Sequence, residues 1–535
     1  MPHYDYIVIG GGSAGSAVAG RLAVDGTRRV CLVEAGGRNN NFLIKTPGFM
    51  PFLRGSSNYR YDTVAQKGLN GRIGYQPRGK GLGGSSAINA MVYIRGNAWD
   101  YDNWAEMGCD GWAYEDVLPW FKKAEGNERG ADAYHGDGGP LFVSNQNHTN
   151  PTSRAFVASA EALQLRGTDD FNGAEQAGFG IYQVTQHKGE RWSAARAYVE
   201  PICDQGNIDI RTNTLVERLV VENGRVTGAV LRKGKQTETI HAGGPGGGGV
   251  ILSAGAFNSP QILMTSGIGP AAHLKDHGID VVSDSGEVGG NLQDHIDYVS
   301  SWATESTDPI GDSLAGTKRM VAAMLEHRRH RTGIMTTPYA EAGGFWRVMD
   351  DAPAPENVPD VQWHFVPALL EDHGREKVKG HGFSLHACVL RPESRGTVRL
   401  NSADAADAPR IDPNFLDDDR DIATLRAGVR LSHRIADAPP LADYDGRDRN
   451  PVDLADDDAL DDLIRNRADT VYHPVGTCRM GSDADAVVDT KLRANGVEGL
   501  WIADASVMPK IVSGNTNAPS IMIGERCADF IMAAE

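Results

Sequence analysis

The sequence is poor in cysteine, has no long hydrophobic run and carries no excess of positive charge. Its six cysteines include no Cys-x-x-Cys pair, so neither a disulfide framework nor a zinc site is expected, and no metal is predicted. No apolar run approaches the ~20 residues that a membrane span needs. A formal net charge of −17 argues against nucleic-acid binding and gives no attraction to anionic lipid.

The N-terminus lacks the basic and apolar regions of a signal peptide, because the first strand-like run begins within a few residues. A cytoplasmic location is therefore expected, with peripheral contact with the inner membrane left open. At 535 residues the chain is too long for one ordinary hydrophobic core, which predicts a globular protein of two domains.

The most informative stretch covers residues 5–36, DYIVIGGGSAGSAVAGRLAVDGTRRVCLVEAG. An apolar run meets Gly10, Gly12 and Gly15, an Ala-rich helical pattern follows, and a second apolar run ends at Glu34. Glycines so placed let a pyrophosphate approach backbone N–H groups at a helix N-terminus. A carboxylate about 20 residues on accepts hydrogen bonds from ribose hydroxyls. The pattern predicts a dinucleotide site, whereas a turn that only packs helix on strand would leave Glu34 unexplained.

Two further motifs contain glycine and serine. In residues 78–96, RGKGLGGSSAINAMVYIRG, three glycines clear space for a planar ligand, while two serines and an asparagine offer short polar groups. Residues 255–269, GAFNSPQILMTSGIG, predict a helix that begins near Ser259, with Pro260 at its first position.

The C-terminal part contains TVYHPVGTCRMG at 470–481 and, later, a helix that is predicted to begin at Asn517. Between them a short apolar strand ends at Asp504, where a carboxylate could meet ribityl hydroxyls. His473 lies in a Tyr-His-Pro turn. Alone it would be interpreted as a core histidine, but near the end of a nucleotide-binding chain it becomes a candidate base.

The pattern changes between about residues 298 and 465. Period-two segments such as 361–366 and 383–390 predict a largely antiparallel sheet with flanking helices, which we interpret as a second domain inserted into the first. The run GGPGGGG at 243–249 predicts a hairpin connection, because no helix with a Lys-Ser/Thr start follows it as in a phosphate loop.

Together these motifs resemble the glucose–methanol–choline (GMC) oxidoreductase family almost end to end. The segments at 79–89 and 255–269 match the family's signatures closely. The stretches NAMVYIRG, YQVTQ, GERWSAARAY, YHPVGTCRMG and GNTNAPSIMI are similar to the choline-dehydrogenase-like branch, especially to bacterial FAD-dependent alcohol or polyethylene glycol dehydrogenases. It is this resemblance, and not composition, that implies FAD in place of NAD.

The resemblance implies an α/β fold in which a Rossmann-type FAD-binding domain carries an inserted α+β substrate domain with a mainly antiparallel sheet. We expect the FAD-binding domain to comprise residues 1–155, 194–297 and 466–535. The substrate-binding domain is expected to comprise residues 156–193 and 298–465.

The resemblance also implies roles for individual residues. His473 is the expected base, and Asn517 is its expected partner across the substrate oxygen. The residues expected to contact FAD are Gly10, Gly12, Ser13, Ala14, Gly15, Glu34, Ala35 and Val216 toward the ADP half, Gly84, Ser85, Asn89, Ala90, Met91 and Val92 along the flavin, and Tyr472, Asp504, Ala505, Asn515 and Thr516 in the C-terminal segment.

The implied reaction is oxidation of a primary alcohol to an aldehyde, with electrons passed to a quinone, a cytochrome or another acceptor. The hydroxyl proton and a hydride must leave the alcohol. Flavin N5 takes the hydride, and neutral imidazole, with a reference pKa of ~6.5, suits the proton.

Three departures from the family's pattern modify this expectation. Some relatives attach flavin covalently through a His where this chain has Ile88, so FAD is expected to be non-covalent. Choline enzymes carry a Glu where this chain has the shorter Asp297, which favours a neutral alcohol over choline. His364 and Phe365, in a period-two segment, are weak candidates for the substrate pocket and equally suit the core.

Other functions stay open at this point. An alcohol oxidase would pass electrons to O₂ and release H₂O₂, and Val471, two residues before His473, resembles a feature of choline oxidases. A flavin-containing lyase would use FAD structurally. Light-driven decarboxylation and simple nucleotide binding are disfavoured, because neither explains His473 with Asn517.

Overall fold

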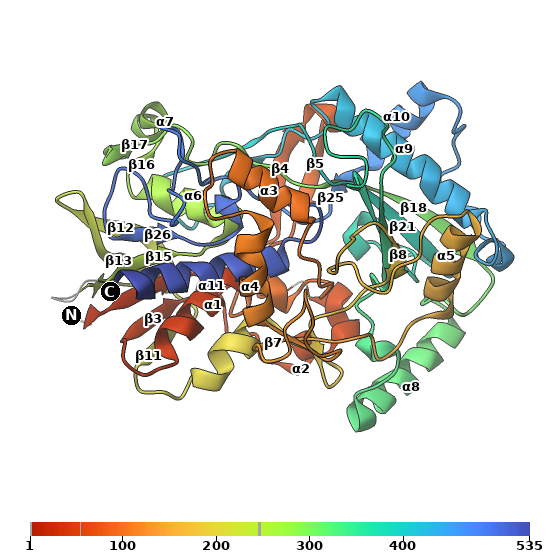
Figure 1. Cartoon of the computed structure of the whole chain (residues 1–535), viewed down its shortest axis with the longest axis horizontal. Coiled ribbons are helices and arrows are strands. Elements are labelled where there is room, and N and C mark those ends of the chain that lie inside the picture. Colours follow the sequence, from red (N-terminus) through yellow and green to blue (C-terminus); the bar gives the residue numbers. More distant parts are fainter. Residues whose placement is uncertain (1–2, 54, 244–247) are drawn as a thin grey trace.

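Two β-sheets of different kinds organise the chain. The computed structural model describes residues 3–53, 55–243 and 248–535. One sheet has five strands that are all parallel, and another has seven strands that are all antiparallel. In Figure 1 the parallel strands lie on the left and the antiparallel strands on the right. The predicted α/β fold with a second, mainly antiparallel sheet is confirmed.

The parallel sheet carries the fingerprint at the ends of its central strands. Its segments YIVI, VCLV and GVIL are buried throughout, as expected for a parallel sheet that is covered on both faces. Helix α1, Ser13–Ala23, follows the YIVI strand in the chain. The strand order is β11 (Ile208–Arg211), β3 (Val30–Val33), β2 (Tyr6–Ile9), β15 (Gly249–Leu252) and β26 (Leu500–Ile502).

The last helix, α11 (Asn517–Ala534), packs along α1, and Figure 1 shows the two helices side by side. The approach is close because Gly524 lies against the backbone of Ala14. A Cβ at Gly524 would be 2.5 Å from the Ala14 carbonyl oxygen. The Ser13 hydroxyl donates to Asn517 Oδ1 at 2.7 Å, so the N-terminus of α11 lies beside that of α1, although 504 residues separate them.

The antiparallel sheet has one face packed against α5 (Pro151–Ala162) and α9 (Asp419–Ala436). This face carries a hydrophobic cluster that includes Trp363, Phe365 and Leu385. Domain boundaries stay a prediction. The strand order is β24 (Arg447–Asp448), β18 (Ile296–Thr304), β21 (His381–Val389), β20 (Val361–Val366), β19 (Ala342–Trp346) and β8 (Gly178–Ile181), with β25 (Asp469–Thr470) also paired to β18.

Smaller sheets and helices complete the fold. Residues 244–247 of the predicted hairpin connection lie outside the described residues. Two four-stranded sheets comprise β1 (His3–Tyr4), β14 (Gln236–Ala242), β13 (Arg225–Lys233) and β12 (Leu215–Glu222), and β22 (Thr397–Arg399), β23 (Arg410–Asp412), β4 (Tyr61–Gln66) and β5 (Arg72–Gln76). Strand pairs are β6 (Glu125–Asn127) with β7 (Leu141–Val143), β9 (Gln186–His187) with β10 (Glu190–Arg191), and β16 (Ile268–Gly269) with β17 (Ser283–Asp284). Further helices are α2 (Phe42–Lys45), α3 (Ala98–Glu106), α4 (Tyr114–Ala124), α6 (Gly255–Thr265), α7 (Ala271–Asp276), α8 (Leu314–His330) and α10 (Asp457–Arg467).

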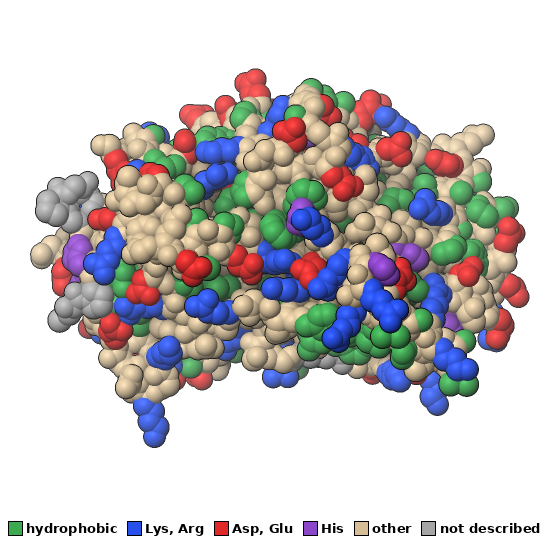
Figure 2. Space-filling view, turned by 90° about the horizontal axis from the view of Figure 1, so that it is seen from below, with side chains coloured by type: hydrophobic (Ala, Val, Ile, Leu, Met, Phe, Trp, Pro, Cys, Tyr) green, Lys and Arg blue, Asp and Glu red, His purple; other side chains and the backbone are tan. Residues whose placement is uncertain are grey.

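Helix α8 lies on the face that Figure 2 shows, where Lys and Arg side chains are spread widely and hydrophobic side chains gather on the right half. Leu314, Val321 and Leu325 of this helix are exposed. Its last turn is basic, but His327 is buried there and contacts the Gly189 carbonyl oxygen at 3.0 Å. Within the described ranges, no helix is both long and apolar enough to cross a membrane.

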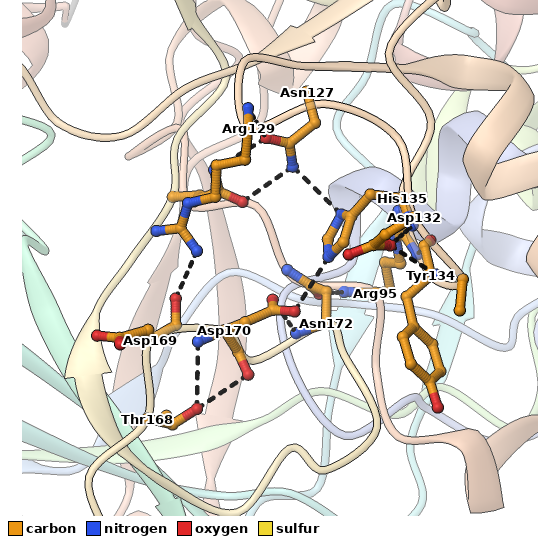
Figure 3. Close-up of polar contacts among 12 residues, drawn as sticks. Arg95, Asn127, Arg129, Asp132, Tyr134, His135, Thr168, Asp169, Asp170 and Asn172 are labelled. Carbon is orange, nitrogen blue, oxygen red and sulfur yellow. Dashed lines mark hydrogen bonds and ion pairs between the residues drawn. The ribbon is translucent and has the colours of Figure 1, made fainter.

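A buried polar cluster fixes the end of the motif at residues 78–96, whose first part, at 79–89, is called the glycine/serine loop below. The backbone N–H of Arg95 donates to Asn172, and its guanidinium contacts the Glu125 carboxylate at 2.5 Å. His135 contacts Glu125 and also Asp170, and Figure 3 shows His135 and Asp170 beside Asn172. Although burial disfavours the imidazolium, contacts with Asp170 and Glu125 raise the pKa of His135 to about 9. Since every charge is paired, the cluster is a structural support for this segment.

Helix α6 begins four residues earlier than predicted, so Pro260 lies within it. The helix starts at Gly255, whose N–H donates to the Asp504 carboxylate at 2.8 Å. Proline has no N–H for the carbonyl four residues before it, which is that of Ala256. The hydroxyl of the buried Thr477 donates to this carbonyl oxygen at 2.6 Å. A residue 221 positions away thus makes the proline compatible with the helix.

We predict that Thr477→Val lowers the free energy of unfolding by about 1–3 kcal/mol, because the Ala256 carbonyl loses its partner in a buried place. Chemical denaturation followed by circular dichroism would measure the change. Thr477→Ser keeps the hydroxyl and serves as the control. An equal loss for both variants would show that the methyl group, and not the hydrogen bond, is responsible.

Candidate active site

A cavity of about 1140 Å³ is lined by residues of all four sequence motifs. It extends from the fingerprint glycines to His473, and the residues predicted to contact FAD or substrate line it with two exceptions. Gly15 lies behind the wall, where a Cβ would be only 1.9 Å from the Gly10 carbonyl oxygen. Phe365 points into the core of the antiparallel sheet, as described below.

The start of α1 opens into this cavity. Gly12 caps the helix, and no side chain satisfies the first N–H groups of the helix at this position. A Cβ at Gly12 would meet nothing closer than the Ser253 carbonyl oxygen at 4.0 Å, so it would occupy cavity space. Unsatisfied N–H groups at a helix N-terminus, reached over a residue without a side chain, form a binding site for a pyrophosphate.

The Glu34 side chain lies at the same end of the cavity and has a structural role that the sequence did not reveal. It accepts hydrogen bonds from the backbone N–H groups of Gly11 at 2.9 Å, Gly36 at 2.8 Å and Gly81 at 2.9 Å. A carboxylate has about four acceptor positions. One acceptor position of Glu34 therefore stays available to a ribose hydroxyl. The other three positions are occupied by the N–H groups of Gly11, Gly36 and Gly81 and so link three chain segments.

The middle of the cavity is formed by the glycine/serine loop and by Asp504. Gly84 packs against Gly12, so the two loops meet directly. Asp504, predicted to meet the ribityl chain, accepts from the Ser259 hydroxyl at 2.6 Å and the Ser506 N–H at 2.8 Å, besides the N-terminus of α6. It lines the cavity and at the same time fixes α6.

The hydrogen bonds of His473 define which of its nitrogens can act as a base. His295 Nε2 lies 3.0 Å from the Leu390 carbonyl oxygen, which only accepts, so this nitrogen carries the proton. Burial lowers the pKa of His295 to about 3, and the ring is neutral. Its Nδ1 therefore accepts from His473 Nδ1 at 3.0 Å. This leaves the lone pair of His473 on Nε2, toward the cavity.

The backbone around His473 is held by Asp294, the neighbour of His295. The Asp294 carboxylate accepts from the His473 N–H at 2.8 Å and from the Thr470 hydroxyl at 2.6 Å. Burial raises the pKa of Asp294 to about 6. Tyr472, between these anchored residues, has a φ of 76°, a conformation that is costly for a residue with a side chain. The Asp294–His295 pair thus fixes both the backbone and the ring of His473.

Asn515, and not Asn517, faces His473. Asn515 Nδ2 lies 3.1 Å from His473 Nε2, whereas the Asn517 carboxamide oxygen accepts from the Ser13 hydroxyl at 2.7 Å. The structure shows no direct contact between Asn517 and His473, and the expected role of Asn517 across a substrate oxygen stays a prediction. The two residues do not touch because α11 begins at Asn517, which places Asn517 beside the start of α1. Asn515, two residues earlier, lies outside the helix and reaches the histidine.

The surroundings keep His473 uncharged. Burial is the main cause that lowers its pKa well below the ordinary value, and His295, His364 and Arg78 add to this effect. A neutral imidazole whose Nε2 lone pair faces an amide N–H donor can accept a proton from a hydroxyl group that enters between them, while the amide holds the hydroxyl oxygen. No cluster of metal-binding side chains occurs in the ranges that the structure describes.

The antiparallel sheet forms the far wall of the cavity, and its alternation decides between two neighbouring predictions. His364 of β20 lines the cavity. Phe365, the next residue, points to the opposite face and stacks on Phe156 at a centroid distance of 4.9 Å. Phe365 is thus a core residue, because successive strand residues face opposite sides. Asp297 of β18 lines the cavity as expected and contacts His386 Nδ1 at 2.6 Å.

Sequence reasoning missed three residues of this site, His295, Asp294 and His386. The first two directly precede Ile296 and Asp297, so their place next to a predicted site residue was a usable signal. His386 lies in a period-two segment at a position that shares a face with His364, its direct partner across the strands. Only the strand register makes that relation visible.

Two family models match the chain. A model described as GMC oxidoreductase, N-terminal part, matches residues 4–297, and the C-terminal model of the same description matches residues 392–524. The chain is 44% identical to an alcohol dehydrogenase (acceptor) of Pseudomonas putida, over 99% of this chain and 96% of that protein. It is 39% identical to an oxygen-dependent choline dehydrogenase of Brucella ovis, over 99% and 95% of the two chains.

Solved structures of similar proteins have the same fold. The crystal structure of a pyridoxine 4-oxidase from Mesorbium loti matches with a TM-score of 0.89 and 30% identity, covering 99% of both chains. A formate oxidase structure matches with a TM-score of 0.92 and 28% identity, covering 100% of this chain and 99% of the other. The similarity therefore extends over both sheets and not only over the fingerprint.

We predict that Gly12→Ala weakens FAD binding at least ~10-fold, because its methyl group would take cavity space at the pyrophosphate position without touching the protein. A fluorescence titration of the apoprotein with FAD would measure the affinity, and the apoprotein's thermal unfolding should stay unchanged. Gly15→Ala is the matched control. Its Cβ would collide with Gly10, so it should lower stability. Unchanged FAD affinity of Gly12→Ala would contradict the assignment.

Proposed function

This chain belongs to the GMC oxidoreductase family, and we propose that it oxidises a primary alcohol to an aldehyde with a non-covalently held FAD. Electrons then pass to a quinone or another acceptor. The observation that carries the proposal is the position of His473 Nε2 and the Asn515 amide at one end of the cavity that begins at the fingerprint glycines. The similarity to an alcohol dehydrogenase (acceptor) supports the same reaction.

The residues present fit FAD, the cofactor of this family. The start of α1 over Gly12 suits the pyrophosphate, and the remaining acceptor position of Glu34 suits the adenosine ribose. Val216, Ala90 and Met91, which the family resemblance assigns to FAD, also line the cavity. Ile88, which cannot form a bond to flavin, supports non-covalent binding. When bound, FAD supplies a hydride acceptor at flavin N5.

The chain's own residues handle the hydroxyl proton. The substrate hydroxyl would donate to His473 Nε2 and accept from Asn515 Nδ2, which now contact each other at 3.1 Å. His295 keeps the proton of His473 on Nδ1, so that Nε2 is always the accepting nitrogen. A base positioned in this way accelerates proton transfer by ~10²–10⁴-fold.

An oxidase that passes electrons to O₂ is the second candidate. Val471 lines the cavity two residues before His473, and one relative is named an oxygen-dependent dehydrogenase. Measurement of H₂O₂ against reduction of a quinone-like dye separates the two. A lyase with structural FAD would leave the flavin oxidised when an alcohol is added without oxygen.

We predict that His473→Ala retains FAD but reduces the rate of flavin reduction by alcohol at least ~10²-fold, since the hydroxyl proton has no acceptor. A normal rate in His473→Ala would remove this residue from the mechanism.

We also predict that Asn515→Ala slows flavin reduction and weakens substrate binding. Asn517→Ala is the comparison variant, because Asn517 contacts Ser13 and not His473, and it should slow reduction less than Asn515→Ala does. Anaerobic stopped-flow absorbance measures all three variants.

We also predict how the reaction depends on pH. Only the neutral form of His473 accepts a proton, and its pKa lies well below 6.5. The second-order rate constant of flavin reduction should therefore stay level as pH falls from 8 to 6.5, and decline only at lower pH. Stopped-flow measurements between pH 5 and 8 test this. A loss of rate already centred at or above pH 6.5 would mean that the buried ring is not the titrating base.

A further inference from the structure

Among the buried side-chain atoms that have no hydrogen-bond partner within the described residues, three lie where the antiparallel sheet forms the cavity wall. They are Asp297 Oδ1, His364 Nδ1 and His386 Nε2, and all three residues line the cavity. The Asp297 and His364 side chains are almost fully buried, with exposed fractions of 5% and 4% for the residues. Folded proteins leave few buried polar groups unpaired, and such groups at a cavity indicate a polar ligand.

The strand register brings these three residues to one face of the antiparallel sheet. His386 of β21 lies directly opposite His364 of β20 and opposite Val299 of β18. Asp297 precedes Val299 by two residues, so it shares this face. Two side-chain distances agree with this placement on one face. The imidazole centroids of His364 and His386 are 6.5 Å apart, and Asp297 Oδ2 lies 2.6 Å from His386 Nδ1.

The hydrogen-bond network defines His364 Nδ1 as a donor. Gln362 Nε2 donates to the Asn515 oxygen at 3.1 Å, so the Asn515 NH₂ group points toward His473 and His364. The His364 Nε2 atom, 3.4 Å from that NH₂ group, is then an acceptor. Burial and His386 lower the pKa of His364 to about 3, so its single proton is on Nδ1.

The cavity wall therefore presents an unpaired donor, His364 N–H, and an unpaired acceptor, Asp297 Oδ1. The other carboxylate oxygen of Asp297 already accepts from His386. A hydroxyl group can pair with either of them, because it can accept a hydrogen bond from His364 Nδ1 or donate one to Asp297 Oδ1. A methyl end would leave both unpaired, and so would a trimethylammonium group, which neither donates nor accepts a hydrogen bond.

We infer that Asp297, His364 and His386 form a subsite for a second hydroxyl group, so that the substrate is a short diol or a related primary alcohol. This inference rests on the proposed function. The proposed base and the subsite are close together, because the Nε2 atoms of His364 and His473 both contact the Asn515 NH₂ group, at 3.4 and 3.1 Å. One hydroxyl of the substrate lies at His473 and the other, a few carbons away, lies at the subsite.

The first test uses the unmodified holoenzyme. Anaerobic stopped-flow reduction is measured with 1-butanol, 1,4-butanediol, 1,3-propanediol and choline. A diol should give a second-order rate constant at least ~10-fold above that of 1-butanol, because a site built for a hydroxyl discriminates strongly against a group that lacks one. Choline should be no better than 1-butanol. Equal or lower rates for both diols would overturn the subsite.

The second test removes the subsite as a pair, with Asp297→Leu/His386→Leu, so that no unpaired charge stays buried. The ratio of the diol rate to the 1-butanol rate should fall at least ~10-fold. Leu325→Ala, at an exposed position of α8 that does not line the cavity, is the control and should leave this ratio unchanged. A ratio that persists in the double variant would contradict the subsite. If the double variant does not retain FAD, the holoenzyme series decides.

The two proposals fail in different ways. If no alcohol of the series reduces the flavin, the proposed function is wrong. If 1-butanol reduces the flavin as well as the diols do, alcohol oxidation stands and only the hydroxyl subsite is lost.

Discussion

The Glu34 carboxylate is the interaction on which the cofactor end of the structure depends. A buried carboxylate needs several donors, and Glu34 obtains them from Gly11, Gly36 and Gly81. These backbone groups belong to three separate segments: the turn before α1, the end of β3 and the glycine/serine loop. One side chain thus sets the distance between two loops that form the cavity wall. The same residue keeps an acceptor position for the ribose, so fold and proposed cofactor binding are joined there.

A comparable constraint operates at the other end of the cavity. Asp294 holds the backbone at His473, and His295 holds its ring, while the Leu390 carbonyl oxygen determines the tautomer of His295. The chain of donors and acceptors leaves one arrangement of protons. The proposed base is therefore prepared before a substrate arrives, and the strained backbone at Tyr472 is kept in place by the contacts on both sides.

The antiparallel sheet serves both the core and the cavity, because its residues alternate between two faces. Phe365 and Leu385 stabilise the core, while their neighbours His364 and His386 face the cavity. Any shift of register by one residue would exchange these roles. The selectivity that we infer for a second hydroxyl is thus a property of strand pairing as much as of residue type.

The resemblance of the sequence to the GMC family marked His473 as the proposed base. The sequence by itself also determined the dinucleotide fingerprint and the parallel and antiparallel character of the two main sheets. These follow from local patterns, namely glycine spacing, apolar runs and period-two alternation. The tertiary structure alone decided that Asn515 and not Asn517 faces His473, that α6 begins at Gly255, and that His386 joins the cavity. Each of these depends on a partner far away in the chain, such as His295, which is 178 residues from His473. Hydrogen-bond partners at that separation are set by packing, which local sequence patterns do not contain.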